Sequence, residues 1–409
     1  MGAGALYTYL NGDEYAGSYP LWDWQLVPGT TVARDGNVAC VETNHHATPT
    51  NDSCWVNCPT TYASGETAFV GVASTGRFAT AAFNFVTPKM WLSRLKYKKS
   101  WHFIDGRIVA MVTGIGKANG GRRSGTDGGH PPLPAVTTSI EQRWLGEGVL
   151  VGVSGQKAAV ELGPNTSRTF PTTAAGAVEW IHHDQSAYIM LPLPTAKAQG
   201  NATVTVSTTV GSGDWSDVGA EEGEVSGGMF TAFIEHDAAA VETGVAAAAY
   251  MVVPSAGAVR RESGAPFDPA LYTRNVAVVD STDSCHAVAA TVTTTSSKTT
   301  TPALRVFSIV FFAPGSTTAP EPWGLVVEAM QACTIVIVEE SSAPTSATQR
   351  TAAAATPTTV MTISDPTQAL GTMAVKTSLS PNIVHATLPK GEFAGKSVTV
   401  QLSPAGSAV

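Results

Sequence analysis

The feature that most constrains this chain is a regular alternation of apolar and small polar residues. It occurs in ATVTVSTTV (residues 202–210), LRVFSIVFF (304–312), TIVIVE (334–339) and SVTVQL (397–402), which are all rich in Val, Ile and Thr. Successive side chains of a β-strand point to opposite faces, so such a segment presents one apolar face to a core. The alternation therefore predicts β-strands in each of these segments.

Helical patterns are scarce by comparison. Glycines interrupt and bracket apolar runs such as VLVGVS (149–154), and no segment keeps an apolar i, i+3, i+4, i+7 stripe over several turns. The best helix candidates are two alanine-rich segments, 238–249 and 352–355. The first continues into AYMVVP, which is more typical of a strand, and the second is flanked by Thr and Pro. We therefore predict an all-β chain of many short strands, as in β-sandwiches or β-barrels.

The charge balance excludes several classes of partner. Charged residues make up 14% of the 409 residues, and the net charge at pH 7 is −8. Binding of nucleic acid requires a basic face that neutralises phosphates, so we expect no nucleic-acid partner. The longest apolar runs are about half the ~20 residues of a membrane span, and MGAGALYTYL shows no signal-peptide pattern. We expect no membrane partner either.

Composition along the chain indicates where domains meet. The segment RRESGAPFDPALYTRN (260–275) combines charge, Gly and two prolines, as linkers often do. We place a boundary there, with a large domain over residues 1–270 and a smaller one over residues 275–409. Thr/Ser/Pro-rich tracts at 291–302 and 341–359 are expected to be surface loops.

A series of short motifs then follows along the chain. They are YPLWDWQLVPGTT (19–31), LKYKKSWHFIDGRIVAMVTGI (95–115), PAVTTSIEQRWL (134–145), EWIHHDQSAYIMLP (179–192), GSGDWSDVG (211–219), FTAFIEHD (230–237) with AAAYMVVPS (247–255), TISDPTQ (362–368) and LPKGEFAGKSVTVQL (388–402). In this order they resemble the β domains of polysaccharide lyase family 8, which contains the hyaluronate, chondroitin and xanthan lyases. The resemblance covers nearly the whole chain.

This resemblance implies both a fold and a division of labour. The fold would be a large antiparallel β-supersandwich of the galactose-mutarotase type, followed by a smaller C-terminal antiparallel β-sandwich domain. In the family, an α/α toroid carries the Asn, His, Tyr and Arg that perform β-elimination next to a uronic acid. None of these matches a position here, so we expect the toroid to be absent and the chain alone to be inactive.

The resemblance also singles out an acidic residue near the start. Glu14, in NGDEYAG (11–17), falls where the family has a glutamate that hydrogen-bonds the catalytic Arg or His. Its expected role is auxiliary, to orient that residue. A solvated loop acid is the alternative, and Asp13 is a weaker candidate.

Aromatic and basic residues offer candidate contacts to a sugar. Trp22 and Trp24 are two apart, so on a strand both indoles would point to one face. They are candidates for stacking on substrate, although burial in the sandwich core is the commoner fate of such residues. A basic run could guide an acidic glycan, but a solvated strand face is the commoner explanation. This run consists of Arg94, Lys96, Lys98 and Lys99.

Cysteines and glycosylation sequons bear on the compartment. The cysteines are Cys40, Cys54, Cys58, Cys285 and Cys333, and the sequons begin at Asn51, Asn165 and Asn201. We expect a disulfide within the early group and a second one between the two late cysteines, in a secreted protein. Zinc ligation by the early cysteines with His45 and His46 fits no standard spacing, so we expect neither metal nor cofactor.

Together these observations lead to one expected function and one rival. We expect the β-domain portion of a secreted polysaccharide lyase that cleaves hyaluronan-, chondroitin- or xanthan-type polymers by β-elimination. Its partner would be an acidic polysaccharide bound through a missing or separate toroid, and the protein would be a monomer. The rival is a stand-alone carbohydrate-binding or structural β protein derived from such a lyase.

Overall fold

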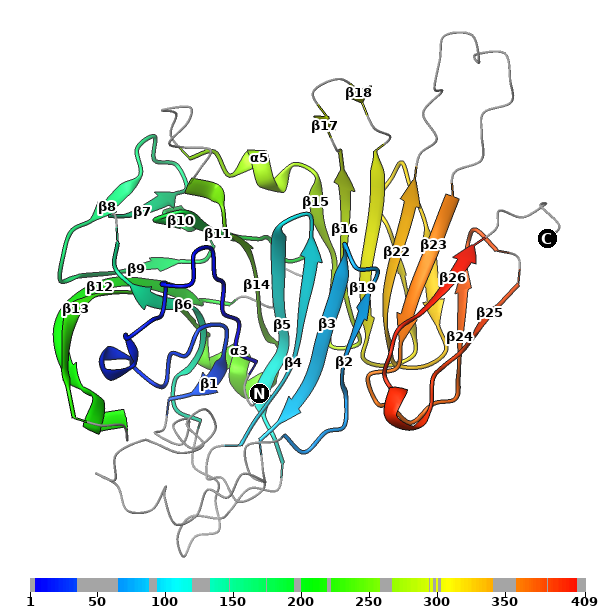
Figure 1. Cartoon of the computed structure of the whole chain (residues 1–409), viewed down its shortest axis with the longest axis horizontal. Helices are drawn as coiled ribbons and strands as arrows, with labels where there is room; N and C mark the ends of the chain where they lie inside the picture. Colours follow the sequence, from blue (N-terminus) through cyan, green and yellow to red (C-terminus); the bar gives the residue numbers. More distant parts are fainter. Residues whose placement is uncertain are drawn as a thin grey trace, which may run out of the picture.

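The structure is a computed structural model, and most of the chain is placed well enough to be described. The described residues are 4–34, 65–87, 94–119, 133–146, 148–173, 175–194, 200–218, 222–257, 267–293, 295–296, 299–300, 303–340, 358–380 and 382–402. Their regular structure is almost entirely antiparallel β-strand, arranged in stacked sheets (Figure 1).

Two sheets form the larger part of the molecule. Sheet A has the strand order β1-β6-β13-β12-β9, with bounds β1 Thr31–Ala33, β6 Val136–Trp144, β9 Thr166–Pro171, β12 Thr203–Asp214 and β13 Glu224–Glu235. Sheet B has the order β2-β3-β4-β5-β14-β11-β10-β7-β8, with bounds β2 Val70–Ser74, β3 Ala79–Val86, β4 Leu95–Ile104, β5 Arg107–Lys117, β7 Val149–Val153, β8 Val160–Leu162, β10 Val178–His183, β11 Ser186–Met190 and β14 Ala246–Val253.

The remaining sheets come from the later part of the chain. Sheet C has the order β15-β16-β19-β22-β23-β26, with bounds β15 Val276–Ser281, β16 Cys285–Val292, β19 Leu304–Phe311, β22 Cys333–Glu340, β23 Thr358–Ser364 and β26 Val398–Leu402. Sheet E has the order β20-β21-β24-β25, with bounds β20 Gly315–Thr318, β21 Val326–Ala329, β24 Thr372–Thr377 and β25 Val384–Thr387. Strands β17 Thr295–Ser296 and β18 Thr299–Thr300 pair with each other.

Helices within the described residues are short. They are η1 Tyr19–Leu21, η4 Trp215–Val218, α3 Ala238–Thr243, α5 Ala270–Thr273 and η6 Gly391–Phe393. None of the helices in this part of the chain has the length and apolar character that crossing a membrane requires.

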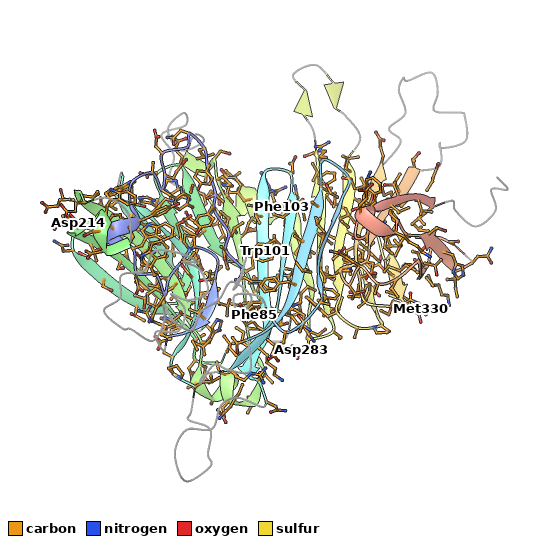
Figure 2. All side chains as sticks on the ribbon, turned by 60° about the horizontal axis from the view of Figure 1, so that its bottom comes forward. Phe85, Trp101, Phe103, Asp214, Asp283 and Met330 are labelled. Atoms are coloured by element: carbon orange, nitrogen blue, oxygen red, sulfur yellow. The ribbon has the colours of Figure 1, made fainter. Side chains whose placement is uncertain are left out.

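Apolar cores hold the sheets together face to face. Phe230 of sheet A and Tyr188 of sheet B belong to the first core, and Met111 of sheet B and Val306 of sheet C belong to the second. A third core joins sheets C and E. Sheet B is therefore covered on both faces, which explains why every residue of β14 is buried. Figure 2 shows Asp214 in sheet A and Met330 after β21 near opposite ends, with Trp101 between.

The all-β prediction is confirmed, since the alternating segments lie in β12, β19, β22 and β26. The alanine-rich segment 238–249 was only partly interpreted correctly, because it forms α3 before it enters β14. The Asp237 carboxylate accepts a hydrogen bond from the Ala240 N–H (2.8 Å) and caps this helix, and Gly244, with φ of 72°, ends it. The strands of sheets A and B all precede residue 254 and those of sheet C all follow residue 275, whereas the domain boundary itself stays a prediction.

Candidate functional site

The chain from residue 4 to residue 34 runs across sheet A mostly without regular structure (dark blue in Figure 1). Leu6 N–H donates to the Pro28 carbonyl (2.8 Å) within the segment, and Gly29 N–H donates to the Ser139 carbonyl of β6 (3.1 Å), which fixes the segment to the sheet. At Gly213 of β12 an added Cβ would lie only 2.2 Å from the Pro20 carbonyl oxygen. Glycine is therefore required there for η1 to rest on the sheet.

This segment carries a connected group of aromatic rings, which we call the N-terminal aromatic patch. Its members are Tyr7, Tyr9, Tyr15, Tyr19, Trp22, Trp24 and Trp215. The Tyr19 ring centroid lies 5.0 Å from that of Trp22 and 6.3 Å from that of Trp215 on η4. Exposure is concentrated on the tyrosines, with Tyr9 55% and Tyr19 38% exposed. The patch thus presents exposed tyrosine side chains to solvent, which suits a saccharide.

The two tryptophans reach this patch by a route that the sequence pattern did not predict. Residues 22–24 follow η1 as irregular chain and not as a strand, so the geometric argument for a shared face was wrong. The rings nevertheless meet, with centroids 5.4 Å apart. Trp22 is 7% exposed and its Nε1 donates to Ser18 Oγ (2.8 Å), whereas Trp24 is half-buried. Trp22 is thus a buried residue, as expected for a tryptophan of the core.

Glu14 lies at the edge of the patch and closes its own loop. Its carboxylate oxygens accept backbone hydrogen bonds from Leu10 (2.6 Å), Asn11 (3.1 Å) and Gly12 (3.0 Å). Partial burial raises the pKa of Glu14, but these backbone donors outweigh that effect, and the net result is a pKa below the usual value. Glu14 is therefore a fixed anion at neutral pH, half-buried at the surface of the segment.

A buried ion pair lies beneath this loop. Arg143 and Glu141, two residues apart on β6, point to the same face, and their side chains are 3% and 2% exposed. Arg143 Nη2 donates to Glu141 Oε2 (2.5 Å), to Thr8 Oγ1 (2.7 Å) and to Tyr15 Oη (2.9 Å). The pair therefore ties sheet A to the N-terminal segment on both sides of Glu14. We call these residues, with Tyr188, the Glu141–Arg143 network.

The tyrosines of the network act as hydrogen-bond donors. Tyr15 Oη donates to Glu141 Oε1 (2.9 Å), and Tyr188 Oη, from β11 of sheet B, donates to Glu141 Oε2 (2.8 Å). Burial, followed by the charge of Glu141, raises the pKa of both phenols. Burial alone would lower the pKa of Arg143, but Tyr188, Glu141 and Tyr15 outweigh it and raise the pKa. The phenols therefore stay protonated. The network joins β6 and β11 to the N-terminal segment, and its tyrosines do not act as general bases.

Sequence reasoning missed this network. The motif PAVTTSIEQRWL (134–145) was noted only for its resemblance, although an acid and a base two residues apart in a strand share one face. That spacing was the available signal. Burial could not be inferred from it, because β6 is buried on both faces from Val136 to Arg143 by contacts with distant segments.

The comparison with protein families decides the identity of this fold. The model of polysaccharide lyase family 8, super-sandwich domain, matches residues 1–263. The chain belongs to polysaccharide lyase family 8. The resemblance inferred from the motifs is thereby confirmed.

Individual members of family 8 agree with this assignment. Chondroitinase-AC of Pedobacter heparinus is 26% identical over 253 residues, which is 61% of this chain and 28% of that protein. Hyaluronate lyase of Thermasporomyces composti is 27% identical over 268 residues, which is 64% of this chain and 28% of that protein. The matched region thus spans under a third of these relatives.

Solved structures support the fold. A chondroitinase AC lyase studied with oligosaccharides superposes with a TM-score of 0.63 at 22% identity, covering 97% of this chain and 47% of that one. The chondroitin AC lyase of Streptomyces coelicolor A3 gives 0.57 at 17% identity, covering 98% and 44%. A xanthan lyase of Paenibacillus gives 0.52 at 17% identity, covering 85% and 26%. The fold of family 8 therefore extends over both halves of this chain.

The basic run of this family 8 chain is solvated only in part, since Lys96 is exposed and Lys98 is half-buried. Lys99 is fully buried, and its Nζ donates to the Gly29 carbonyl in the Pro-Gly-Thr-Thr turn and to Thr31 Oγ1 (3.1 Å). Arg94, 4% exposed, pairs with Glu66. Arg94 and Lys99 therefore anchor neighbouring segments, whereas Lys96 faces solvent.

The prediction of a disulfide between Cys285 and Cys333 is wrong. Both residues are free and buried. In sheet C, Cys285 on β16 pairs with Phe311 on β19, and Phe311 pairs in turn with Cys333 on β22. The two cysteines are thus two strand spacings apart, about 10 Å, which is beyond the reach of a disulfide.

The other expected sites have different outcomes. Cys40, Cys54, Cys58 and Asn51 lie outside the described residues. Asn165 is exposed in the turn before β9, where its side-chain oxygen accepts from Val210 N–H (2.7 Å), and Asn201 is exposed before β12. Their glycosylation stays a prediction.

Proposed function

We propose that this chain is the β-domain portion of a secreted polysaccharide lyase that acts by β-elimination on a uronic-acid-containing polysaccharide. The observation that carries the proposal is the N-terminal aromatic patch, exposed at one end of sheet A with the fixed anion Glu14 at its edge. Such a surface can hold sugar rings and can orient a cation of an adjoining domain. The polymer class follows from the names of the relatives, which are lyases of chondroitin and hyaluronan.

We further propose that the acid and base of the reaction are supplied from outside this sequence, by an α/α toroid. β-Elimination needs neutralisation of the uronate carboxylate, a base for the C5 proton and an acid for the leaving oxygen. Two features of the described residues support this division. Tyr15 of the patch and Tyr188 of sheet B are held protonated, and burial lowers the pKa of His183 and His236 to about 3. We also propose that the chain divides into domains over residues 1–270 and 275–409 and that the protein is a monomer.

A turnover assay with the isolated chain tests the proposal. Elimination creates an unsaturated uronate that absorbs ultraviolet light, so hyaluronan, chondroitin sulfate and xanthan can each be followed directly. We expect no rise in absorbance with the chain alone, together with retardation of the chain in native gels that contain the polysaccharide. A steady rise would show that these residues contain a complete catalytic set and would refute the proposal.

Substitution of Glu14 tests the auxiliary role in an assembly with a toroid domain. Glu14→Gln keeps the shape but removes the charge, so kcat should fall about 10- to 100-fold, the scale of a charged hydrogen bond worth ~1.5–3 kcal/mol, while KM changes little. Asp13→Asn is the matched control, because Asp13 precedes Glu14 in the same loop and is exposed. Equal effects of the two substitutions, or a change in KM alone, would leave Glu14 with only its loop-closing role.

The rival function, a stand-alone carbohydrate-binding protein, is favoured by the same exposed rings. The two candidates differ in what a toroid domain adds. If adding a family 8 toroid to the chain produces turnover that depends on Glu14, the lyase proposal stands. If the chain binds polysaccharide tightly and no toroid restores turnover, the binding protein is the better description.

A further inference from the structure

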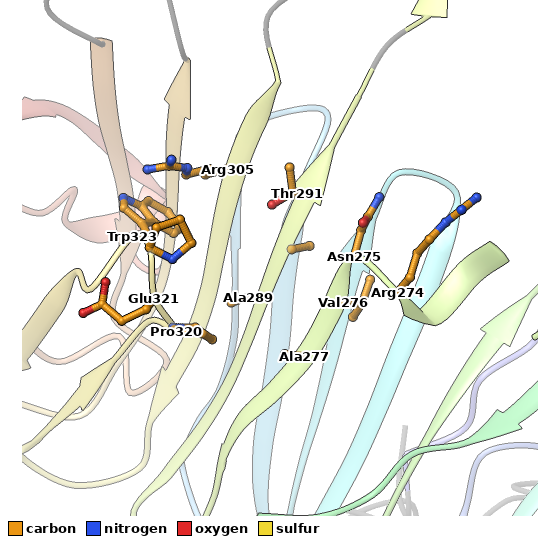
Figure 3. A pocket seen from close by; sticks show the side chains of 12 residues that line it. Arg274, Asn275, Val276, Ala277, Ala289, Thr291, Arg305, Pro320, Glu321 and Trp323 are labelled. Carbon is orange, nitrogen blue, oxygen red and sulfur yellow. The ribbon is translucent and has the colours of Figure 1, made fainter. Parts of the chain in front are cut away.

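A pocket of about 240 Å³ lies in sheet C, far along the chain from the N-terminal aromatic patch. It is formed by the start of β15, the end of β16, Arg305 of β19 and the loop 320–323 between β20 and β21 (Figure 3). The residues that matter for the argument are Arg274, Asn275, Ala277, Thr291, Arg305 and Trp323.

Strand register explains why these side chains share one side of sheet C. Thr291 pairs with Arg305, and Arg305 pairs with Glu339 of β22, so the three form one row across the sheet. In the next row Ala277 pairs with Ala289. Ala289 belongs to the core between sheets C and E, so both rows lie on the face that sheet E covers farther along. The alanines leave a low floor between taller side chains.

One wall of the pocket is held rigidly. Glu339, whose side chain is 9% exposed, accepts a hydrogen bond from Arg305 Nη1 (3.1 Å) and another from Trp323 Nε1 (3.2 Å). The indole also packs against Phe307, with ring centroids 6.0 Å apart. Because one buried carboxylate fixes both side chains, the ring and the guanidinium are held in place before any ligand arrives. Arg305 stays 37% exposed, so part of its fork is accessible.

The opposite wall carries a second cation. Arg274 follows α5 and is exposed, and among the residues that the structure describes it forms no ion pair with a carboxylate. Figure 3 shows Arg274 and Asn275 on one side of the alanine floor, with Arg305 and Trp323 on the other. Glu321 lies beside Trp323, and its carboxylate points away from the alanine floor.

We propose that this pocket is a second saccharide-binding site, which takes an anionic sugar unit such as a uronate or a sulfated hexosamine. The apolar face of the sugar ring packs on Trp323, and its hydroxyl groups reach Asn275 and Thr291. Its carboxylate or sulfate pairs with the accessible part of the Arg305 fork and with Arg274, whose exposed side chain turns from its outward position in Figure 3 towards the alanine floor. The volume is below the roughly 300–1,000 Å³ of pockets for drug-sized ligands, and it suits one or two sugar units of a longer chain. The choice of an acidic saccharide as probe rests on the proposed function, whereas the site itself rests on its own geometry.

The site would anchor polysaccharide away from the N-terminal aromatic patch. When one polymer chain is bound at this pocket, its effective concentration at the N-terminal aromatic patch is raised, and no new contact at the patch is needed. Loss of the pocket should therefore weaken binding of long polymers more than binding of short ones.

Calorimetry with a chondroitin sulfate hexasaccharide tests the proposal, with a neutral malto-oligosaccharide of equal length as comparison. The parent is the Tyr9→Ala/Tyr19→Ala double variant, in which the N-terminal aromatic patch is weakened, so that the signal reports the pocket. Arg274→Ala should weaken binding by roughly tenfold, the lower end for a charged hydrogen bond. Ala277→Phe fills the floor and should abolish binding. Arg168→Ala, an exposed arginine on β9, is the matched control and should change the dissociation constant less than twofold.

The possible outcomes separate this inference from the proposed function. If the parent does not bind, or if Arg274→Ala and Ala277→Phe bind as the parent does, the pocket is not a saccharide site, while the turnover test of the lyase proposal is unaffected. Equal binding of the malto-oligosaccharide would overturn the acidic class of ligand. If the pocket binds but no toroid produces turnover, this inference stands and the lyase proposal fails.

Discussion

Substitution of Arg143 by Met is the sharpest test of how the N-terminal segment is held. Met keeps an apolar stem of similar length but removes the cation that pairs with Glu141 at 2.5 Å. The two tyrosine hydroxyl groups still donate to Glu141, yet its charge loses its buried counterion. Removing one partner of a buried ion pair costs about 3–5 kcal/mol, because the other charge is left uncompensated. Thr8 also loses its hydrogen bond from Arg143.

The assay is urea unfolding followed by circular dichroism, with an exposed ion pair as the control. Arg77 and Asp105 lie 3.4 Å apart with side chains 44% and 40% exposed, so Arg77→Met should cost no more than about 1 kcal/mol. Adding Glu141→Gln to Arg143→Met removes the unpaired charge and should recover part of the loss. Hydrogen exchange should rise in residues 8–15, since these are the residues that the pair anchors.

Two results would refute this reasoning. The first is a loss of stability for Arg143→Met no greater than that for Arg77→Met. The second is a double variant that is less stable than Arg143→Met alone. Either would mean that the ion pair contributes no more inside the protein than a pair at its surface.

Two further predictions follow from buried titratable groups. Burial lowers the pKa of several histidines to about 3, and these are His102, His183 and His236. Because their pKa in the unfolded chain is near 6.5, stability is fully present above that pH and is lost as the pH falls from 6.5 towards 3, by ~1.4 kcal/mol per pH unit for each residue. The urea midpoint should therefore drop steeply below pH 6.5, and a flat profile down to pH 5 would contradict the burial argument. Burial also raises the pKa of Cys285 and Cys333. Iodoacetamide should therefore modify neither thiol in the native protein and both thiols after unfolding, as measured by peptide mass spectrometry. Modification of Cys285 in the native protein would contradict the burial of these thiols.

The candidate site was predictable only in part. The position of Glu14 followed from the motif around it, and the structure places that residue at the edge of the exposed rings. The Glu141–Arg143 network was not predicted, because its partners Thr8 and Tyr188 lie 135 and 47 residues away from them. The same is true of Lys99, which the local pattern places on a strand with other basic residues but whose carbonyl partner is 70 residues away.

The sequence by itself determined which segments are strands and which face of each is apolar. Alternation is a property of neighbouring residues, so residues 202–210, 304–312 and 334–339 could be assigned without knowledge of the rest of the chain. Sheet order was decided only by tertiary structure, because it depends on which distant strands pair. That order places β19 between Cys285 and Cys333 and prevents their bridge, and it brings Arg305 beside Glu339 to build one wall of the pocket. A local pattern indicates which face of a segment is apolar and can be buried. Only the pairing and packing of distant segments decide which residues cover that face.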